Sequence, residues 1–296
     1  YSVTISDSYS CDTVINVEVL QPNPLSANSN PTHVTCFGGN DGELLITATG
    51  GSNSYNISWA GTASGNPIGF EILPDGGTYA ISNLVAGPYQ VILTDQNLCS
   101  NTIFPTIFQP DQLIVYTSFD SVSCNGLTDG AAFIDSTTGG SIPYSYLWNT
   151  GETNDTAVNL AAGTYTVTVT DLFLCDTTIT VEVEEPDALL IASMSMDSAS
   201  CNGVADGTAT ANGITGGNGI NSFSWNTTPV QTTNPATGLA AGNYTVTVTD
   251  QKGCFTTRDT TVLEPDALLI ASMSMDSASC NGVADGTATA NGITGG

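Results

Sequence analysis

The sequence predicts an all-β protein in which tandem immunoglobulin-like β-sandwich modules form an extended rod. The first observation is an internal repeat, because residues 185–217 return unchanged as residues 264–296. The second is the alternation in residues 244–249 (Tyr-Thr-Val-Thr-Val-Thr), which places Tyr and Val on one strand face and Thr on the other. The third is the even spacing of Gly-Gly, Asp-Gly and Asn-Gly turn signals, with no apolar helical stripe between them.

Weaker copies of the repeat share the same landmarks in the same order. Each copy opens with Cys-x-Gly-x-x-Asp-Gly or a close variant, beginning at Cys36, Cys124, Cys201 and Cys280. A Gly-Gly pair follows, then one Trp in each complete copy, then Leu-x-Ala-Gly-x-Tyr and an alternating strand. A second Cys precedes a closing strand that ends in Gln-Pro or Glu-Pro.

These landmarks set the predicted domain boundaries. Residues 1–22 are the last two strands of a truncated repeat, and residues 266–296 are the first strands of another. Three complete repeats lie between them, at 23–110, 111–186 and 187–265, and an insertion around residues 60–77 lengthens the first. Because the sequence opens within a strand pattern, we expect it to be a segment of a longer protein.

Aromatic residues recur once per repeat at positions that suit a core. Trp59, Trp148 and Trp225 are predicted to be the central core aromatics. Three tyrosines follow Ala-Gly turns, where a tyrosine-corner residue would lie: Tyr89, Tyr165 and Tyr244. Short Pro-containing links join the repeats, and because Pro fixes φ and disfavours helix before it, these links are predicted to stiffen the rod.

The charge balance excludes whole classes of partner. The chain has 28 acidic residues and two basic ones, which gives a formal net charge of −26. A phosphate backbone needs Lys and Arg to displace its counterions, so nucleic acid and anionic membrane surfaces are not expected partners. No stretch is long and apolar enough for membrane insertion of this segment. The acidity either keeps a crowded secreted surface soluble or provides Ca²⁺ sites.

The aspartates at turns are the predicted ligands of structural Ca²⁺, and no other cofactor is expected. Carboxylate oxygens are the ligands that Ca²⁺ prefers. Asp-Gly is also a favoured hairpin pair, which gives the same residues a purely structural interpretation. The candidates lie in the first turn and after the long strand of each repeat: Asp41, Asp95, Asp129, Asp171, Asp206, Asp250 and Asp285.

Eight cysteines recur in register with the repeat, two in each. With no Cys-x-x-Cys pair and a single His, this regularity predicts disulfides rather than zinc. Disulfides in turn imply an extracellular location. The favoured connectivity is within repeats, as Cys36–Cys99, Cys124–Cys175 and Cys201–Cys254, which leaves Cys11 and Cys280 as halves of truncated repeats.

Two other connectivities use the same cysteines. Pairing of sequence neighbours (11–36, 99–124, 175–201, 254–280) would require bridging a closing strand and an opening strand, far beyond the Cα separation of about 7 Å that a disulfide tolerates. Linking consecutive repeats as Cys36–Cys175 and Cys124–Cys254 stays open, because an ordinary sandwich places its first and last turns at opposite ends.

The pattern Ser-Cys-Asn-Gly-x-x-Asp-Gly, Gly-Gly, Tyr-x-Trp-Asn-Thr, Leu-Ala-Ala-Gly-x-Tyr-Thr-Val-Thr-Val-Thr-Asp and Cys resembles the SprB repeat. That family is known from giant cell-surface adhesins of gliding Bacteroidetes. The resemblance is strongest at residues 122–171 and 200–250, and the first repeat departs from it, with Phe37 where the others have Asn. The resemblance implies an immunoglobulin-like fold, export by type IX secretion, and a role in adhesion or as a surface stalk on gliding cells.

A second pattern fits that source. Several short segments resemble the acceptor pattern of O-glycosylation in Bacteroidetes, which is Asp, then Ser or Thr, then a small apolar residue or Thr. The alternative interpretation of each match is an ordinary Asx or Ser/Thr turn. Eight hydroxyls satisfy the rule: Thr13, Ser121, Ser136, Thr156, Thr177, Ser198, Thr260 and Ser277.

The residue inventory argues against an enzyme. Acid–base catalysis near neutral pH usually needs His, and one His, one Lys and one Arg cannot supply a repeated active site. The leading hypothesis is therefore a structural stalk or filament segment of a large bacterial cell-surface adhesin, whose partners are other repeats of the same chain. The alternatives are a module that itself binds surface polysaccharide or other cells, and a self-assembling surface fibre.

Overall fold

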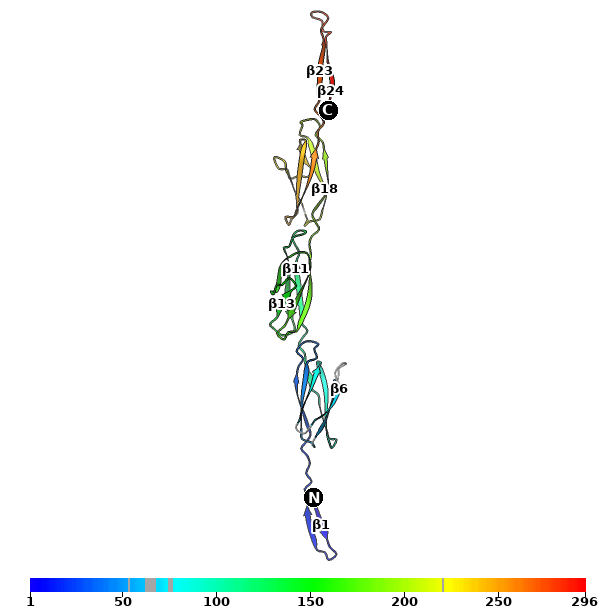
Figure 1. Cartoon of the computed structure of the whole chain (residues 1–296), viewed down its shortest axis with the longest axis vertical. Helices are drawn as coiled ribbons and strands as arrows, with labels where there is room; N and C mark the ends of the chain where they lie inside the picture. Colours follow the sequence, from blue (N-terminus) through cyan, green and yellow to red (C-terminus); the bar gives the residue numbers. More distant parts are fainter. Residues whose placement is uncertain (53, 62–67, 74–76, 220) are drawn as a thin grey trace. The chain divides into compact units, whose positions relative to one another are not determined.

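The computed structural model describes residues 1–52, 54–61, 68–73, 77–219 and 221–296. These residues form 24 strands, β1 to β24, and no helix (Figure 1). The all-β prediction is confirmed. No helix capable of spanning a membrane exists in the part that is described.

The third repeat shows the arrangement most simply. Its first sheet has the order β17-β18-β20, with bounds Leu190–Asp197, Gly207–Thr215 and Ala236–Leu239. Its second sheet has the order β19-β21-β22, with bounds Ser222–Trp225, Gly242–Thr249 and Phe255–Val262. An immunoglobulin domain has seven strands. Counted in chain order, its first, second and fifth strands lie in one sheet and its third, sixth and seventh in the other, and the six strands of this repeat follow that arrangement. The immunoglobulin-like prediction is therefore confirmed, with the fourth strand of that fold absent from the described part of this repeat.

The second repeat has the same strand order. Its sheets are β11-β12-β14, at Ile114–Asp120, Gly130–Thr138 and Thr156–Leu160, and β13-β15-β16, at Ser145–Trp148, Gly163–Thr170 and Asp176–Val183.

The first repeat adds strands to this scheme. One sheet is β3-β4-β7, at Ser26–Thr32, Gly42–Thr49 and Thr78–Leu84. The other is β10-β8-β5-β6 with β9 also on β8, at Thr106–Ile107, Gly87–Asp95, Tyr55–Gly61, Ile68–Leu73 and Ser100–Ile103. The predicted insertion therefore contributes β6 to the edge of this sheet, and residues 62–67 and 74–76 of it lie outside the described residues.

A two-stranded hairpin stands at each end of the chain. The N-terminal one pairs β1 (Ser2–Ser6) with β2 (Asp12–Asn16), and the C-terminal one pairs β23 (Leu269–Asp276) with β24 (Thr287–Thr294). The C-terminal hairpin reproduces the register of β17 on β18, since Ile270 faces Ile293 as Ile191 faces Ile214. Identical sequence thus gives identical pairing.

The cores follow the period-two pattern. In β21, Val246 and Val248 are fully buried, and the threonines beside them are not. Apolar residues of both sheets meet in one cluster in the first repeat and in another in the third, which makes each a sandwich. Trp148 and Trp225 are 1% exposed, as predicted, whereas Trp59 is only partly buried and packs against the edge of its cluster. Tyr55 fills the first core instead, with its hydroxyl donating to the Gly50 carbonyl at 2.7 Å.

The tyrosine-corner prediction is confirmed in all three complete repeats. Each hydroxyl donates to a backbone carbonyl four residues upstream at 3.0 Å: Tyr89 to Val85, Tyr165 to Ala161, and Tyr244 to Ala240. These bonds fix the turn that precedes the long strand, and the strand in turn positions the second cysteine of the repeat.

The described residues fall into two compact units. Unit 1 comprises Tyr1–Tyr116, Asp135–Leu147 and Thr168–Ile179, and unit 2 comprises Thr117–Ile134, Trp148–Val167 and Thr180–Gly296. The first repeat lies in unit 1, the third in unit 2, and the second contributes to both. The extended rod and the repeat boundaries stay predictions.

Candidate functional site: the joints between repeats

The second cysteine of each repeat lies in a turn that we name the closing turn, at residues 7–11, 95–99, 171–175 and 250–254. In the third repeat this turn joins β21 to β22. Asp250 Oδ1 accepts the backbone N–H groups of Lys252 and Cys254, both at 2.9 Å, and the Asp250 N–H donates to the Cys254 carbonyl at 2.9 Å. The carboxylate therefore organises the loop that presents the cysteine.

The same arrangement recurs in every copy. Asp7, Asp95 and Asp171 each accept the N–H groups two and four residues later through one carboxylate oxygen. The residue just before each cysteine has positive φ: Ser10 at 63°, Leu98 at 65°, Leu174 at 66° and Gly253 at 89°. A non-glycine residue in this region is uncommon, so its recurrence shows that the aspartate bonds hold the turn in a defined shape.

The Gly-Gly pair of each repeat seats this carboxylate. A Cβ on Gly216 would lie 2.0 Å from the Ala188 carbonyl oxygen, and one on Gly217 would lie 2.8 Å from Asp250 Oδ2. Both glycines also have positive φ. Only glycine therefore allows the segment after Pro186 and the closing-turn aspartate to approach this closely.

The first cysteine lies in the opening turn, at residues 36–41, 124–129, 201–206 and 280–285. In the second repeat, Asp129 accepts the Ser123 N–H at 2.9 Å and the Ser123 hydroxyl at 2.5 Å. Asp41, Asp206 and Asp285 accept the equivalent N–H groups of Thr35, Ser200 and Ser279. Each opening turn is thus closed by its own aspartate.

The two disulfides link consecutive repeats. Cys36 bonds to Cys175 and Cys124 to Cys254, with Cα–Cα distances of 5.6 Å in both and S–S distances of 2.03 and 2.04 Å. We name these the first joint, which lies in unit 1, and the second joint, which lies in unit 2. Four cysteines are free thiols: Cys11, Cys99, Cys201 and Cys280.

The favoured connectivity within repeats, Cys36–Cys99, Cys124–Cys175 and Cys201–Cys254, is therefore wrong, and the alternative that links consecutive repeats is the one observed. The reason lies in the strand order. Gly207, just after the opening turn, pairs with Leu239, so both lie at the same end of the sandwich. Strand β21 starts three residues after Leu239 and runs towards the opposite end. Eight residues of strand carry the closing turn about 26 Å away, and a disulfide tolerates only about 7 Å between Cα atoms.

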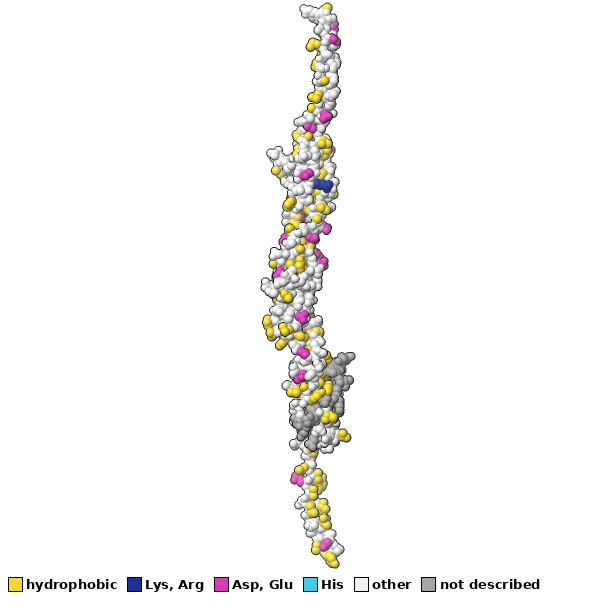
Figure 2. Space-filling model, in the orientation of Figure 1, with side chains coloured by type: hydrophobic (Ala, Val, Ile, Leu, Met, Phe, Trp, Pro, Cys, Tyr) yellow, Lys and Arg dark blue, Asp and Glu magenta, His cyan; other side chains and the backbone are white. Residues whose placement is uncertain are grey.

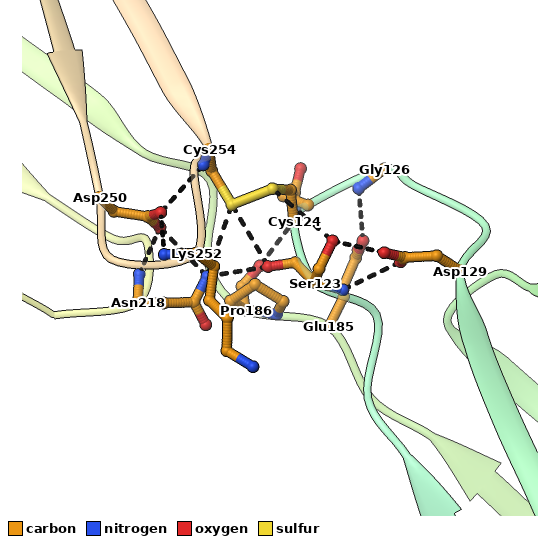
Figure 3. Close-up of a disulfide and its surroundings, with 11 residues drawn as sticks. Ser123, Cys124, Gly126, Asp129, Glu185, Pro186, Asn218, Asp250, Lys252 and Cys254 are labelled. Carbon is orange, nitrogen blue, oxygen red and sulfur yellow. Dashed lines mark hydrogen bonds between the residues drawn. A yellow bond between two sulfur atoms is a disulfide. The ribbon is translucent and has the colours of Figure 1, made fainter.

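Hydrogen bonds accompany the second disulfide (Figure 3). Asn218 donates from its backbone N–H at 2.6 Å and from Nδ2 at 3.1 Å to Asp250 Oδ2, and Nδ2 also lies 2.9 Å from the Ser123 carbonyl. Glu185 accepts the Gly126 N–H at 2.8 Å. The linker and the third repeat are thus bonded to the opening turn of the second repeat independently of the sulfur atoms.

Sequence reasoning missed several of these residues. Asp7 carries the same Asp-x-x-x-Cys signal as the three aspartates that were predicted, so its spacing could have identified it. Glu185 and Glu264 directly precede the linker proline, but nothing in their type marks them as partners of the opening turn. Asn218 gives no sequence signal, because Ser52 and Ser141 stand at the equivalent positions after the Gly-Gly pair.

Hydrogen bonds lower the pKa of several turn aspartates. The pKa of Asp129 is lowered by the hydrogen bonds from the Ser123 hydroxyl and N–H, and that of Asp206 by the equivalent bonds from Ser200. For Asp250, burial raises the pKa, but the N–H groups of Asn218, Cys254 and Lys252 outweigh it and lower the pKa overall. Each of these three carboxylates thus accepts hydrogen bonds from N–H or hydroxyl groups close to it, and for Asp250 one donor, Asn218, comes from outside the closing turn.

The seven aspartates predicted as Ca²⁺ ligands lie one to a turn. The described part of the chain contains no group of three His, Cys, Asp or Glu close enough to hold a metal ion. Figure 2 shows acidic side chains spread over the visible face rather than gathered in one patch. Calcium binding at these positions stays a prediction, and any ion there would compete with backbone N–H groups for the carboxylate oxygens.

The predicted glycosylation positions are accessible. Thr13, Ser121, Ser136, Ser198 and Ser277 are exposed, and Thr156, Thr177 and Thr260 are half-buried. Thr177 lines a cavity that Cys36 and Cys175 of the first joint also line. Modification of these hydroxyls is untested.

Comparison with known proteins gives a family match. The model of the SprB repeat matches residues 28–64 and 117–153, which are the opening halves of the first and second repeats. No curated protein matches the chain.

Similarity to solved structures is distant. The chain is 12% identical to an intimin fragment in complex with the intimin-binding domain of its translocated receptor, with TM-score 0.32 over 56% of this chain and 65% of that one. It is 14% identical to part of a 1.5-MDa bacterial ice-binding adhesin, with TM-score 0.32 over 82% and 99%. It is also 14% identical to titin domains A168–A170, with TM-score 0.24 over 82% and 99%. The strand order therefore shows the fold, and the family model shows SprB-repeat sequence at residues 28–64 and 117–153.

Proposed function

We propose that this chain is a tension-bearing stalk segment of a large secreted bacterial cell-surface adhesin. The SprB repeats support the cell-surface assignment. The repetition supports the stalk, because a run of similar sandwich units sets reach and stiffness and leaves binding to other parts of a protein. Other repeats of the same chain are then the main partners.

The staggered connectivity of the disulfides carries this proposal. The loop closed by Cys36–Cys175 and the loop closed by Cys124–Cys254 overlap between Cys124 and Cys175. Every peptide bond between Cys36 and Cys254 is therefore spanned by at least one disulfide. Tension applied at the two ends passes through the sulfur atoms, and most of the first and third sandwiches lies outside the shortest covalent path, which crosses the second repeat between Cys124 and Cys175.

Composition supports a non-catalytic role outside the cell. Disulfides persist in oxidising compartments, and the single His, Lys and Arg offer little for acid–base chemistry. The net charge of −26 disfavours nucleic acid and anionic membranes as partners and keeps neighbouring stalks apart. Export by type IX secretion, a place in gliding motility, and O-glycosylation at the eight hydroxyls complete the proposal.

Two measurements on the purified chain test the stalk. Small-angle X-ray scattering should give a radius of gyration at least twice the roughly 19 Å of a compact 296-residue domain. A glycan array should show no specific binding at micromolar concentration. A compact particle would contradict the stalk, and specific glycan binding would favour the alternative of an adhesive module. Growth of fibres with concentration would favour the self-assembling fibre.

A further inference from the structure

We propose that the opening turn of the third repeat, together with the linker 265–268, is an acceptor site for the closing turn of another SprB repeat, and that Cys201 forms a disulfide with the cysteine of that turn. In both observed joints an opening cysteine bonds to the closing cysteine of the following repeat. Cys201 is an opening cysteine, and residues 266–296 contain an opening turn but no closing turn. It is a free, exposed thiol in this structure.

The acceptor already has the hydrogen bonds of a filled joint. Gly203 N–H donates to Glu264 Oε2 at 2.7 Å, as Gly126 does to Glu185 at 2.8 Å in the second joint. Asn202 Nδ2 donates to the Pro265 carbonyl at 3.3 Å, as Asn125 does to the Pro186 carbonyl at 3.1 Å. The opening turn and linker are therefore shaped before any closing turn binds.

The receiving end of the next hairpin is also in place. The Gly296 N–H donates to the Asp266 carbonyl at 3.0 Å, as the Gly217 N–H does to Asp187 at 2.8 Å. A Cβ on Gly295 would lie 2.2 Å from the Ala267 carbonyl oxygen, which repeats the close approach of Gly216 to Ala188. The glycine pair that seats the closing-turn aspartate in a filled joint thus has the same geometry here.

A cavity marks where the closing turn would lie. Cys201, Asn202, Pro265, Leu268 and Gly296 line it, within unit 2. The corresponding cavity of the first joint, within unit 1, has the equivalent residues Cys36, Phe37, Pro110, Leu113 and Gly140 as one wall. Its other wall is the closing turn, including Asp171, Leu174 and Cys175. The two cavities differ chiefly in that second wall.

The filled joints show which kind of closing turn the acceptor site would bind. It is a turn of the form Asp-x-x-x-Cys with a positive φ before the cysteine, whose thiol reaches Cys201 and whose aspartate caps the Gly-Gly pair. By the same rule Cys280 is a second acceptor cysteine, and Cys11 and Cys99 are donors. A continuous array joined in this way would have every internal peptide bond spanned by a disulfide, so that a single proteolytic cut would not sever it.

The chain itself supplies the test, because residues 266–296 are identical to residues 187–217. Appending a copy of residues 218–265 after Gly296 completes a repeat identical in sequence to the third one. The extended chain is oxidised with glutathione disulfide. Cys201 and the appended cysteine each lose a proton, the two sulfur atoms lose two electrons in forming the bond, and glutathione disulfide is reduced to two molecules of glutathione.

The experiment measures the number of free thiols after oxidation. The present chain has four free thiols among eight cysteines. The extended chain gains a cysteine, yet should have three, and peptide mapping should join the Cys201 peptide to the appended closing turn. The matched control carries Cys201→Ser and should keep four free thiols, with the appended repeat still folded by calorimetry.

Three outcomes would overturn the inference: five free thiols in the extended chain, a disulfide between Cys201 and any other cysteine, or an appended repeat that does not fold beside an intact acceptor. The inference does not depend on the stalk function, since it concerns which cysteines meet. A compact particle in the scattering experiment would reject the stalk and leave the pairing rule in place.

Discussion

The two joints have the same covalent bond and different polar contacts. In the first joint Gly38 N–H donates to Gln109 Oε1 at 2.9 Å, and Ser141 donates only its N–H to Asp171 among the bonds described. In the second joint a glutamate replaces that glutamine, and Asn218 adds a side-chain amide that reaches both Asp250 and the Ser123 carbonyl. The disulfide and the glycine N–H bond therefore recur in both joints, whereas the accepting side chain and the contacts made after the Gly-Gly pair differ.

The largest expected effect comes from removing the disulfides altogether. In the oxidised chain the shortest covalent path between the termini includes fewer than half of the 296 residues. At about 3.4 Å per residue, full extension should reach roughly 440 Å when oxidised and roughly 1,000 Å when reduced. Single-molecule force spectroscopy of the chain tethered at its ends measures both lengths.

The variants Cys175→Ser and Cys254→Ser sharpen this measurement, because each removes one joint and leaves the other. Each should lengthen the fully extended chain by about 100 Å relative to the oxidised parent. If the two variants match the oxidised parent, the observed connectivity is wrong.

The next largest effect is expected from proteolytic cleavage within one repeat, because only one of the two disulfides spans the cleaved bond. A protease site inserted after Val230, in an exposed loop of the third repeat, lies within the Cys124–Cys254 loop and outside the Cys36–Cys175 loop. After cleavage the parent should migrate as one species on a non-reducing denaturing gel. The Cys254→Ser variant should separate into two fragments, and the Cys175→Ser variant should not. Separation in the parent would contradict the second joint.

The closing-turn aspartates should respond unequally to substitution. Asp→Asn replaces an acceptor with a donor facing backbone N–H groups, so we expect Asp250→Asn to lower the Tm of its repeat by roughly 5–10 °C. Asp171→Asn should cost less, because Asp171 has no side-chain amide partner equivalent to Asn218. Calorimetry of the two variants gives the difference. Equal shifts would mean that the Asn218 amide contributes nothing.

The sequence predicts the repeat better than the joint, for a physical reason. Strand alternation, turn glycines and the corner tyrosines act within one repeat, so the sandwich follows from local patterns. The cysteine pairing depends on which ends of a sandwich face each other, and that requires the course of every strand. Two cysteines per repeat suggested pairing within a repeat, although opposite-end placement of the first and last turns already argued for the alternative.

The first core shows a second limit. A single Trp per repeat predicted the same central aromatic throughout, yet Tyr55 occupies the first core and Trp59 lies at its edge, where it packs against Tyr79 with ring centroids 5.6 Å apart. Here the strand from the insertion, β6, pairs with β5 and changes the environment of that Trp. An extra edge strand changes packing in a way that the spacing of landmarks does not report.

Exchange of Asn218 and Ser141 offers a finer comparison of the two joints. Asn218→Ser gives the second joint the residue that the first joint has, and Ser141→Asn makes the reciprocal change. A net hydrogen bond contributes about 1 kcal/mol, so Cys124–Cys254 in Asn218→Ser should be reduced about fivefold faster by a fixed concentration of dithiothreitol. Mass-spectrometric quantification of each disulfide over time measures this, with Cys36–Cys175 in the same molecule as the internal control. Equal acceleration of both disulfides would point to a global effect.

The smallest expected effect is the pH dependence of the opening turns. Hydrogen bonds from Ser123 lower the pKa of Asp129, and those from Thr35 lower the pKa of Asp41, below the ordinary value of 3.8. A carboxyl group whose pKa is lower in the folded state stabilises the fold fully above its unfolded pKa and loses that contribution as the pH falls through the folded pKa. Both turns should therefore be unaffected between pH 8 and about pH 5 and weaken only below about pH 4. Thermal melts of Asp129→Asn should show a shallower acid limb than the parent, and an unchanged limb would show that the Ser123 bonds do not couple ionisation to folding.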